Sequence, residues 1–593
     1  MFLFPGCSKK LSEAPQGLNE KLKFTESEYY DAIKSGFNDK NFLKDSSFQY
    51  LDTLKDFYAE RNFQPVYLKS YEEKNFIDSM LIIIKNAVEH GLNPEEYHLS
   101  LISTYFHKSI DTLNNPDRLN LLADSELLLA DAILKYAWHM RYGVVNPKDL
   151  LPDNYYLPVP DSSKRDLFEP FRENNIVQYL YSIQPKSKNY KGLEAALIRF
   201  RAFKNLKWEV IPPVNKKIEP GDSYPDIKLI ADRLIKLGFL DSSKVKPGDI
   251  SIYDSLLLEP VKKFQRLNGL NEDGVIGKNT IEKLNITPED YIKKIKVNLE
   301  RLRWIDYSDT SRYIVVNIPD FRLHAVENKK ELFNIKVCIG RKRAANFEKR
   351  LKVYKKTKRL RDRPDDWETP CMYGEISNLI LNPAWDVPPN IIREEILAGL
   401  RKDSSYLFDK NFKVYKDGAE INYKDVKLKE LASDNIPYKI VQEPGEENAL
   451  GKIKFIFKNP FGIYLHDTPS RVPFSLSNRA VSHGCIRVEK PLILADYLLK
   501  NNSKWNIDFL KIEIGQKVDD KSKIFEYYNK RRELRKNGGF GKSTEVILDK
   551  GIPLLVDYHT SWVDDNGEIN FRDDVYDQDK ILIEYLFPSE VSK

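Results

Sequence analysis

The C-terminal half of the chain contains the segments IYLHDTP at residues 463–469 and SHGCIRV at residues 482–488. His466 ends an apolar, strand-like run, and the loop between it and Cys485 is long enough to bring the two side chains face to face. A cysteine thiol is a weak nucleophile until a neighbouring group takes its proton. Gly484 permits a tight backbone in which consecutive N–H groups converge on one oxygen. The spacing therefore indicates a nucleophile, a base and an oxyanion site; the alternative is a buried cysteine and a strand-end histidine.

The residues around these segments predict a β-rich domain. Tyr313–Ile318 and Phe321–Val326 alternate with a period of two and flank the turn Pro319-Asp320, which is typical of a strand-turn-strand unit. Further strand-like runs are Phe333–Ile339, Asn378–Asn382, Ile453–Phe457, Gly462–His466 and Pro553–Asp557. We therefore expect a β-rich catalytic domain over residues 291–593.

Two stretches interrupt this pattern. Residues 341–366 contain 12 Lys/Arg and 4 Asp/Glu, a net charge of +8. This basic insertion is interpreted either as a solvated loop or hairpin extension, or as a surface that attracts anionic wall polymer or lipid headgroups. Residues 390–450 are helical and then irregular, without a clear sheet period. Their position between strands predicts an insertion that folds over the sheet as a lid.

Residues 21–215 are mostly helical in pattern. Asp124-Ser125 is a candidate N-cap for the helix Glu126–Trp138, and Gly143 ends that helix before Asn146-Pro147. Its apolar residues are too numerous for a surface helix, so we expect it at the centre of a bundle. This region contains no cluster of reactive side chains and is interpreted as a scaffold.

A small module follows over residues 216–290, after a linker rich in proline. Ile227–Gly238 and Leu258–Asn268 are helical in pattern, and the motifs GL (269–270), DGVIG (273–277) and TIEKL (280–284) come after them. These elements, in this order, resemble the three-helix peptidoglycan-binding domain. A calcium loop is excluded because glycine and threonine would occupy its first and last ligand positions.

The histidine, the spacer and the sequence Ser-His-Gly-Cys-x-Arg resemble the L,D-transpeptidase family. Together with the scaffold and the wall-binding module, the whole chain resembles the large periplasmic members. Trp385, in the run LNPAWDVPP, lies where those members carry a similar run. The resemblance implies an α+β multidomain protein with a helical scaffold, a three-helix peptidoglycan-binding domain and a β-rich catalytic domain with a lid. Two features depart from the family: the basic insertion is longer than expected, and the N-terminus lacks a complete signal.

The resemblance also implies roles for the residues of the two segments. Cys485 is the nucleophile and His466 is the general base. Asp467 orients His466 through either its backbone carbonyl or its carboxylate, and we favour the carbonyl. The main-chain N–H groups of His483, Gly484 and Cys485 form the oxyanion hole.

Four more residues are expected around the substrate. Arg487 reads a substrate carboxylate through its planar guanidinium, or alternatively braces the loop. Ser482 orients the cysteine loop. Tyr464 and Trp385 complete the predicted substrate site.

The implied reaction forms 3→3 cross-links between peptidoglycan stem peptides through a cysteine thioester, in cell-wall biogenesis and the maintenance of cell shape. Carbapenems are the expected covalent inhibitors. A cysteine carboxypeptidase or endopeptidase that trims stems, and a non-catalytic wall-binding scaffold, are the alternatives. The sequence contains no phosphate loop, HExxH or CxxC motif, so we expect no cofactor and no metal.

Composition limits the remaining possibilities. The chain has 593 residues, of which 41% are hydrophobic, and its net charge of only +6 argues against a nucleic-acid partner. Residues 1–20 contain an apolar stub, Gly6 and Cys7, which resemble a lipoprotein cleavage box; an inert cysteine is the alternative. We expect a monomer in the periplasmic cell envelope that lipidated Cys7 anchors to a membrane.

Overall fold

The computed structural model describes residues 24–588, except for residues 70–72, 112–116, 160–165, 246–251, 306–310, 360–361 and 535–542. The predicted anchor at residues 1–20, with Cys7, therefore lies outside the described residues. The chain divides into two compact units. The first, the helical unit, comprises Met1–Asn146, Val159–Leu206 and Thr287–Asp306, and the second comprises Pro147–Pro158, Lys207–Ile286 and Tyr307–Lys593.

Helix α7 (Arg118–Tyr142) is the centre of the helical unit, and most of its residues are buried. It ends at Gly143, whose φ of +82° suits a glycine, as predicted. The predicted start at Glu126 is wrong, because the helix begins at Arg118. Ser125 does not cap it: its hydroxyl donates to the carbonyl of Leu121 at 2.7 Å, inside the helix.

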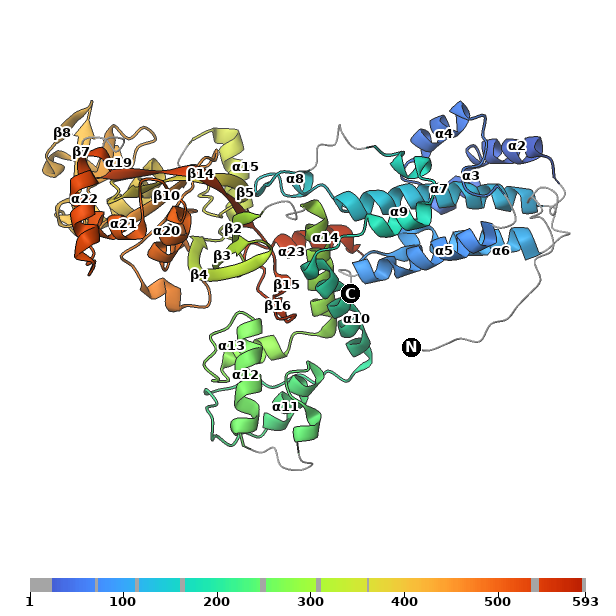
Figure 1. Ribbon diagram of the computed structural model, residues 1–593, viewed down its shortest axis with the longest axis horizontal. Helices are drawn as coiled ribbons and strands as arrows, with labels where there is room; N and C mark the ends of the chain where they lie inside the picture. Colours follow the sequence, from blue (N-terminus) through green and yellow to red (C-terminus); the bar gives the residue numbers. More distant parts are fainter. Residues whose placement is uncertain are drawn as a thin grey trace. The chain divides into compact units, whose positions relative to one another are not determined.

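Helices α2 (Glu26–Gly36), α4 (Leu51–Glu60), α6 (Leu99–Asp111) and α14 (Pro288–Trp304) pack against α7, and α10 (Lys188–Ala202) packs against α14 (Figure 1). The unit also contains α3 (Lys40–Ser46), α5 (Glu73–Asn86) and α9 (Ile176–Ser182).

Helix α14 corrects the predicted boundary at residue 291, because it packs in the helical unit rather than in the catalytic domain. Glu300 Oε1 accepts hydrogen bonds from the N–H groups of Val144 and Val145, at 2.7 and 3.1 Å. A second correction concerns Pro147–Pro158, which was predicted as scaffold. This segment belongs to the second unit, where β1 (Tyr155–Tyr156) pairs in parallel with β5 (Cys371–Leu381).

The small module of the second unit contains α11 (Ile227–Lys236), α12 (Ser255–Leu267) and α13 (Lys278–Leu284). Gln265 on α12 fixes the loop before α13. Its Nε2 donates to the carbonyl of Val275 at 2.9 Å, and its Oε1 accepts from the N–H of Gly274 at 2.8 Å. The glutamine and the glycine-containing loop of the sequence motif are thus one hydrogen-bonded unit.

The larger part of the second unit is built on a ten-stranded sheet. The hairpin of β2 (Arg312–Asn317) and β3 (Arg322–Glu327) confirms the predicted strand-turn-strand unit. The remaining strands are β1, β4 (Lys330–Gly340), β5, β10 (Ile453–Phe457), β11 (Leu465–His466), β12 (Ala480–Ser482), β13 (Ile486–Val488) and β14 (Thr544–Asp557). Because β14 pairs with both β2 and β5, the sheet closes on itself.

One predicted strand, Gly462–His466, is shorter than expected. Only Leu465 and His466 are extended in β11, because Gly462 has a φ of +66° and the side chain of Asn459 bonds to the backbone N–H and carbonyl of Ile463. Outside the sheet lie α20 (Pro491–Leu499), α21 (Ile507–Glu513), α22 (Lys521–Leu534), α23 (Gln578–Leu586) and the pair β15 (Ser561–Val563) and β16 (Ile569–Phe571).

The structure corrects the interpretation of both insertions. The basic insertion contains a helix, α15 (Phe347–Thr357), rather than a loop or hairpin. The predicted lid contains a second sheet, which the sequence did not indicate. In order across the sheet, its strands are β6 (Trp385–Asp386), which precedes the predicted lid in sequence, and then β9 (Tyr438–Gln442), β7 (Phe412–Lys416) and β8 (Ala419–Ile421).

This small sheet has its own hydrophobic core, which includes Ile396, Leu407, Val414, Leu431 and Ile440. The insertion also contains α16 (Pro389–Ile391), a π-helical turn at Ile392–Ile396 and α17 (Leu397–Lys402). Its strands are too short for their alternation to stand out from the sequence. Within the described ranges, the helices lack the length and apolar character needed to cross a membrane.

Candidate active site

Strand pairing brings the two sequence segments together. Strands β11 and β13 are parallel, with Leu465 opposite Ile486 and His466 opposite Arg487, and the N–H of Ile486 donates to the carbonyl of Tyr464 at 3.0 Å. Cys485 immediately precedes β13 and therefore lies beside Tyr464. Since side chains alternate along a strand, Cys485 and His466 occupy neighbouring diagonal positions on the same face.

Tyr464 lies beside Cys485, and both its backbone and its hydroxyl group act to lower the pKa of the thiol. Burial raises the pKa of this thiol, while Tyr464 and the positive charges of Lys454 and Arg487 oppose the rise. The net direction is upward, so the thiol is protonated at neutral pH and needs a base. Cys338 and Cys371 are fully buried, whereas Cys485 is partly exposed.

His466 has the geometry of that base. Its Nδ1 lies 2.5 Å from the carbonyl oxygen of Asp467. A carbonyl only accepts, so Nδ1 carries the proton and Nε2 keeps its lone pair. Burial, followed by the charge of Arg487 and that of Lys454, lowers the pKa of His466 to about 3, although the bond to Asp467 acts in the opposite direction. The ring is therefore neutral over the physiological pH range.

The carboxylate of Asp467 points elsewhere. It accepts from the N–H of Lys452 at 2.9 Å and from Arg471 Nη2 at 2.6 Å. The backbone at Gly451, which has a φ of +61°, passes close to this carboxylate. A Cβ at that position would lie 2.4 Å from Asp467 Oδ2. Of the two alternatives left open by the sequence, the carbonyl contacts His466 and the carboxylate ties down the turn before β10.

The backbone of the cysteine loop is bonded on both sides. Ser482 Oγ donates to the carbonyl of Cys485 at 2.6 Å and accepts from the N–H of Gly484 at 3.2 Å. Gly484 has a φ of +106°, which favours glycine. Because its N–H is already bonded, the remaining candidate oxyanion donors are the N–H groups of His483 and Cys485, for which the described part of the chain shows no acceptor.

Residues that the sequence did not single out hold this loop from behind. Thr369 Oγ1 donates to the carbonyl of Gly484 at 2.8 Å and accepts from the N–H of Gly340 at 2.9 Å. Tyr576 donates from its hydroxyl to the carbonyl of Gly340 at 2.6 Å. A Cβ on Gly340 would lie 1.6 Å from the carbonyl oxygen of Trp367, so only glycine fits there. These contacts join segments far apart in sequence, which is why no local motif revealed them.

The side chain of His483 links the cysteine loop to the lid-like insertion. Its ring packs edge-to-face on Trp367, with centroids 4.6 Å apart. Its Nε2 lies 3.1 Å from Glu395 Oε1 and 3.8 Å from Glu394 Oε2. The contact with Glu395 lacks the alignment of a hydrogen bond. Both glutamates belong to the π-helical turn Ile392–Ile396, so the insertion contributes to the surroundings of the cysteine loop.

The other predicted substrate residues also lie at this place. Trp385, on strand β6 of the small sheet, lies near Tyr464 and acts to lower the pKa of its hydroxyl group against the effect of burial. Arg487 lies on β13 opposite His466, and the structure shows no ion pair for it with any described residue. The alternative role for Arg487, bracing the loop, thus has no ion pair to support it among those residues. Lys454, on β10 opposite His466, is a residue that the sequence analysis missed.

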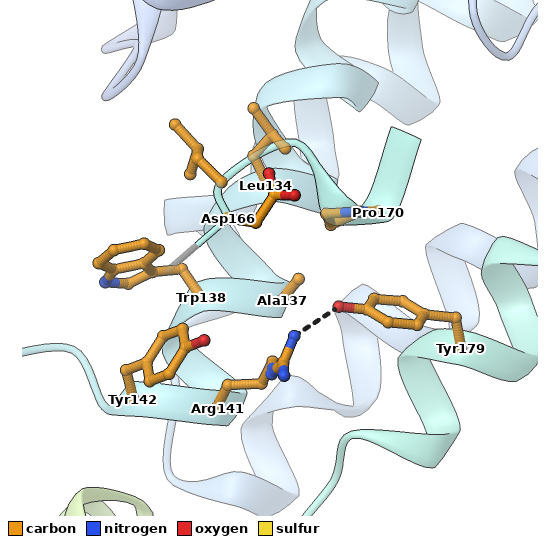
Figure 2. Close-up of a pocket in the computed structure, with 9 residues that line it drawn as sticks. Leu134, Ala137, Trp138, Arg141, Tyr142, Asp166, Pro170 and Tyr179 are labelled. Atoms are coloured by element: carbon orange, nitrogen blue, oxygen red, sulfur yellow. Dashed lines mark hydrogen bonds between the residues drawn. The ribbon is translucent and has the colours of Figure 1, made fainter. Parts of the chain in front are cut away.

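A separate pocket lies in the helical unit, between α7, α9 and the segment around Pro170 (Figure 2). Trp138 and Tyr142 pack edge-to-face with centroids 5.0 Å apart, and Arg141 donates to the hydroxyl of Tyr179 at 3.3 Å. None of the predicted catalytic residues lines it. Among the described residues there is also no group of three His, Cys, Asp or Glu that could hold a metal ion.

Comparisons with known proteins follow the same division of the chain. Residues 52–197 match the family described as "Scaffold domain", residues 223–284 match "Putative peptidoglycan binding domain", and residues 311–519 match "L,D-transpeptidase catalytic domain". A Haemophilus influenzae protein described as "Putative L,D-transpeptidase" is 29% identical over 309 residues, which are 51% of this chain and 50% of that protein. The chain thus spans about half the length of this curated relative.

Two crystal structures of L,D-transpeptidases also match, at low similarity. The structure from Xylanimonas cellulosilytica has 13% identity and a TM-score of 0.17, and covers 58% of this chain and 100% of its own. The structure from Stackebrandtia nassauensis has 12% identity and a TM-score of 0.19, and covers 58% of this chain and 97% of its own.

Proposed function

We infer that this chain, which contains an L,D-transpeptidase catalytic domain together with a scaffold domain and a peptidoglycan-binding domain, forms 3→3 cross-links between stem peptides through a thioester on Cys485. The observation that carries the proposal is the pairing of β11 with β13. This pairing sets Cys485 beside Tyr464 and diagonal to a neutral His466 whose Nδ1 is fixed on the carbonyl of Asp467.

The first half-reaction is acylation. His466 Nε2 takes the proton of Cys485 as the sulfur attacks the carbonyl carbon of the third residue of a tetrapeptide stem. The N–H groups of His483 and Cys485 stabilise the resulting oxyanion. When the tetrahedral intermediate collapses, the C–N bond to the terminal D-alanine breaks. His466 returns its proton to the departing amine, which leaves a thioester on the enzyme.

The second half-reaction transfers the acyl group. A side-chain amine of a neighbouring stem attacks the thioester carbonyl and gives up a proton to His466. Collapse then forms the new amide and expels the thiolate of Cys485, which His466 reprotonates. Arg487 faces this site without an ion-pair partner among the described residues, which suits a residue that binds a substrate carboxylate.

Product analysis tests the reaction against its rivals. Purified protein is incubated with a soluble disaccharide-tetrapeptide, and the products are separated and weighed by mass spectrometry. A dimer linked between two third residues is expected. Disaccharide-tripeptide without dimer would instead identify a hydrolase that trims stems. Unchanged substrate would indicate that the protein is a non-catalytic wall-binding scaffold.

The contact between His483 and the insertion gives a first prediction. Glu395→Gln removes the charge 3.1 Å from His483 and should slow acylation of Cys485 about two- to fivefold, the size expected for the loss of one partly exposed charged contact. Acylation is followed by intact-protein mass spectrometry. The matched control is Glu420→Gln, which breaks a surface pair with Lys413 in the same insertion and should leave the rate unchanged. Equal rates in both variants would show that this contact does not position the loop.

The wall-binding module can be tested by excision. Its ends meet, because Ile211 and Asn285 exchange two hydrogen bonds of 2.9 and 2.8 Å. Replacing residues 212–284 with a short glycine linker should leave acylation by soluble stems nearly unchanged, since the module contains no catalytic group. Co-sedimentation with insoluble sacculi should weaken. Undiminished sedimentation would assign binding to another surface, such as the basic insertion.

Inhibition gives a third prediction, which comes from the family resemblance. A carbapenem should form one covalent adduct on Cys485, faster than a penicillin does. Arg487→Ala should slow the adduct by about tenfold, less than a change in His466, because Arg487 would hold a carboxylate and would not move a proton. Intact mass spectra with peptide mapping measure this. An adduct on Cys338 or Cys371 would contradict the site.

The peptidoglycan-binding and transpeptidase domains indicate a location at the cell wall. We propose more narrowly that the protein is periplasmic, that lipidation of Cys7 anchors it to a membrane, and that its cross-links contribute to cell shape.

A further inference from the structure

Three side chains form a row across neighbouring strands of the catalytic sheet. Lys454 on β10 is directly opposite His466 on β11, and His466 is directly opposite Arg487 on β13. Directly paired residues point to the same face of a sheet. His466 therefore lies between two cationic residues, a lysine on one side and an arginine on the other.

Lys454 also touches the residue that holds the nucleophile. Its Nζ lies 3.8 Å from the centroid of the Tyr464 ring, a close cation–π contact. The centroids of the Tyr464 and His466 rings are 5.7 Å apart, and Tyr464 lies beside Cys485 in the pairing of β11 and β13. In the part of the chain that the structure describes, Lys454 has no ion pair. Its charge is thus not neutralised by an adjacent carboxylate.

We propose that Lys454 is a positioning residue of the transpeptidase site, whose ammonium group favours the thiolate of Cys485 and keeps His466 neutral until it receives the thiol proton. This role rests on the proposed function of Cys485 and His466 as nucleophile and base. Lys454 lies outside the two sequence segments that contain His466 and Cys485, so the motif does not predict this role.

The physical effect has opposite signs on the two reacting groups. A nearby positive charge stabilises an anion and destabilises a second cation. Lys454 accordingly lowers the pKa of Cys485 against the effect of burial, and it lowers the pKa of His466 further. Other charged or titratable groups also face these residues. Arg487 and Tyr464 lie beside His466 and Cys485, and the charge of Asp386 interacts with Lys454. Arg487 in turn interacts with Glu395 and Cys338.

Alkylation of Cys485 tests the proposal without a peptidoglycan substrate. Wild type, Lys454→Met and Lys454→Arg are treated briefly with iodoacetamide from about pH 6 to about pH 11.5, and modification of the peptide that contains Cys485 is followed by mass spectrometry. Lys458→Met is the matched control, because Lys458 is exposed and directly follows the same strand. Thermal melting checks that all variants are folded.

In Lys454→Met the midpoint of alkylation should rise by about one pH unit, as expected for the loss of one nearby charge. The rate at pH 7 should fall about threefold, because a tenfold loss of thiolate is partly offset by the greater nucleophilicity of a more basic thiol. Lys454→Arg should keep the wild-type midpoint to within about 0.3 units, since it keeps the charge. The acid limb of acylation should also move to higher pH in Lys454→Met only, as His466 becomes easier to protonate.

An unchanged midpoint in Lys454→Met would overturn the proposal. Equal changes in Lys454→Met and Lys454→Arg would also overturn it, because packing rather than charge would then be responsible. The outcome is separable from the reaction itself: a shifted midpoint without any 3→3 product would retain the role of Lys454 and reject the transpeptidase proposal.

Discussion

Replacing Cys485 with alanine should abolish both acylation and cross-linking, a loss of at least about 10³-fold, because the covalent intermediate forms on its sulfur. No other described cysteine can take over: Cys338 and Cys371 are fully buried, and burial raises the pKa of Cys338 to about 11. The measurement is formation of 3→3 dimer together with intact-protein mass. Cys371→Ala is the matched control and should retain activity. Dimer formed by Cys485→Ala at a measurable rate would reject the nucleophile.

Replacing His466 with alanine should reduce acylation at pH 7 by about 10³-fold. The raised pKa of Cys485 keeps the thiol protonated at this pH, and the variant has lost the base that would take the proton. Part of the rate should return above pH 9, where the thiol ionises unaided. Initial rates of acylation from pH 5 to pH 10 measure both effects. Full activity of His466→Ala at neutral pH would move the role of base to another residue, with His483 as the first candidate.

The pH dependence of acylation by the wild type tests the protonation state of His466. Protonated His466 cannot accept the thiol proton, and burial and the neighbouring cations lower its pKa to about 3. At pH 5 only about 1% of the rings would be protonated. Acylation should therefore show no loss centred near pH 6.5, the ordinary pKa of histidine. A loss centred there would contradict the buried, neutral state of the ring.

Asp467→Asn separates the two alternatives for the group that orients His466. The backbone carbonyl survives this substitution, so the rate should fall far less than in His466→Ala. The melting temperature should fall, because the carboxylate bonds to Arg471 and to the N–H of Lys452. A loss of rate as large as that of His466→Ala would point to the carboxylate instead.

The features that the sequence predicted well are local ones. The alternation in Tyr313–Ile318 and Phe321–Val326 is strong because one face of each strand is buried, and it defined the hairpin β2–β3 correctly. The motifs around His466 and Cys485 are continuous in sequence, so their residue types alone indicated a site. Gly143 was recognised as a helix end because glycine readily adopts the positive φ that commonly ends a helix.

The features that it missed depend on pairing over long distances. Lys454 is an ordinary polar residue in the alternating segment Ile453–Phe457, and only its register with His466 places it in the site. Thr369 and Glu395 contact the cysteine loop from other elements, so no spacing reveals them. Most of helix α14 fell within the predicted catalytic domain, which began at residue 291. The local sequence does not show which unit the helix packs against, and only the fold places it in the helical unit.

The central claim is that Cys485 carries the acyl group between donor and acceptor stems. The most direct measurement is to mix the protein with disaccharide-tetrapeptide, stop the reaction in acid after a few turnovers, and map the modified peptide by mass spectrometry. We expect one adduct on the peptide that contains residues 482–488, with the mass of the stem after loss of D-alanine, which disappears as 3→3 dimer accumulates. Dimer formation without any adduct on Cys485, or an adduct on another residue, would contradict the account.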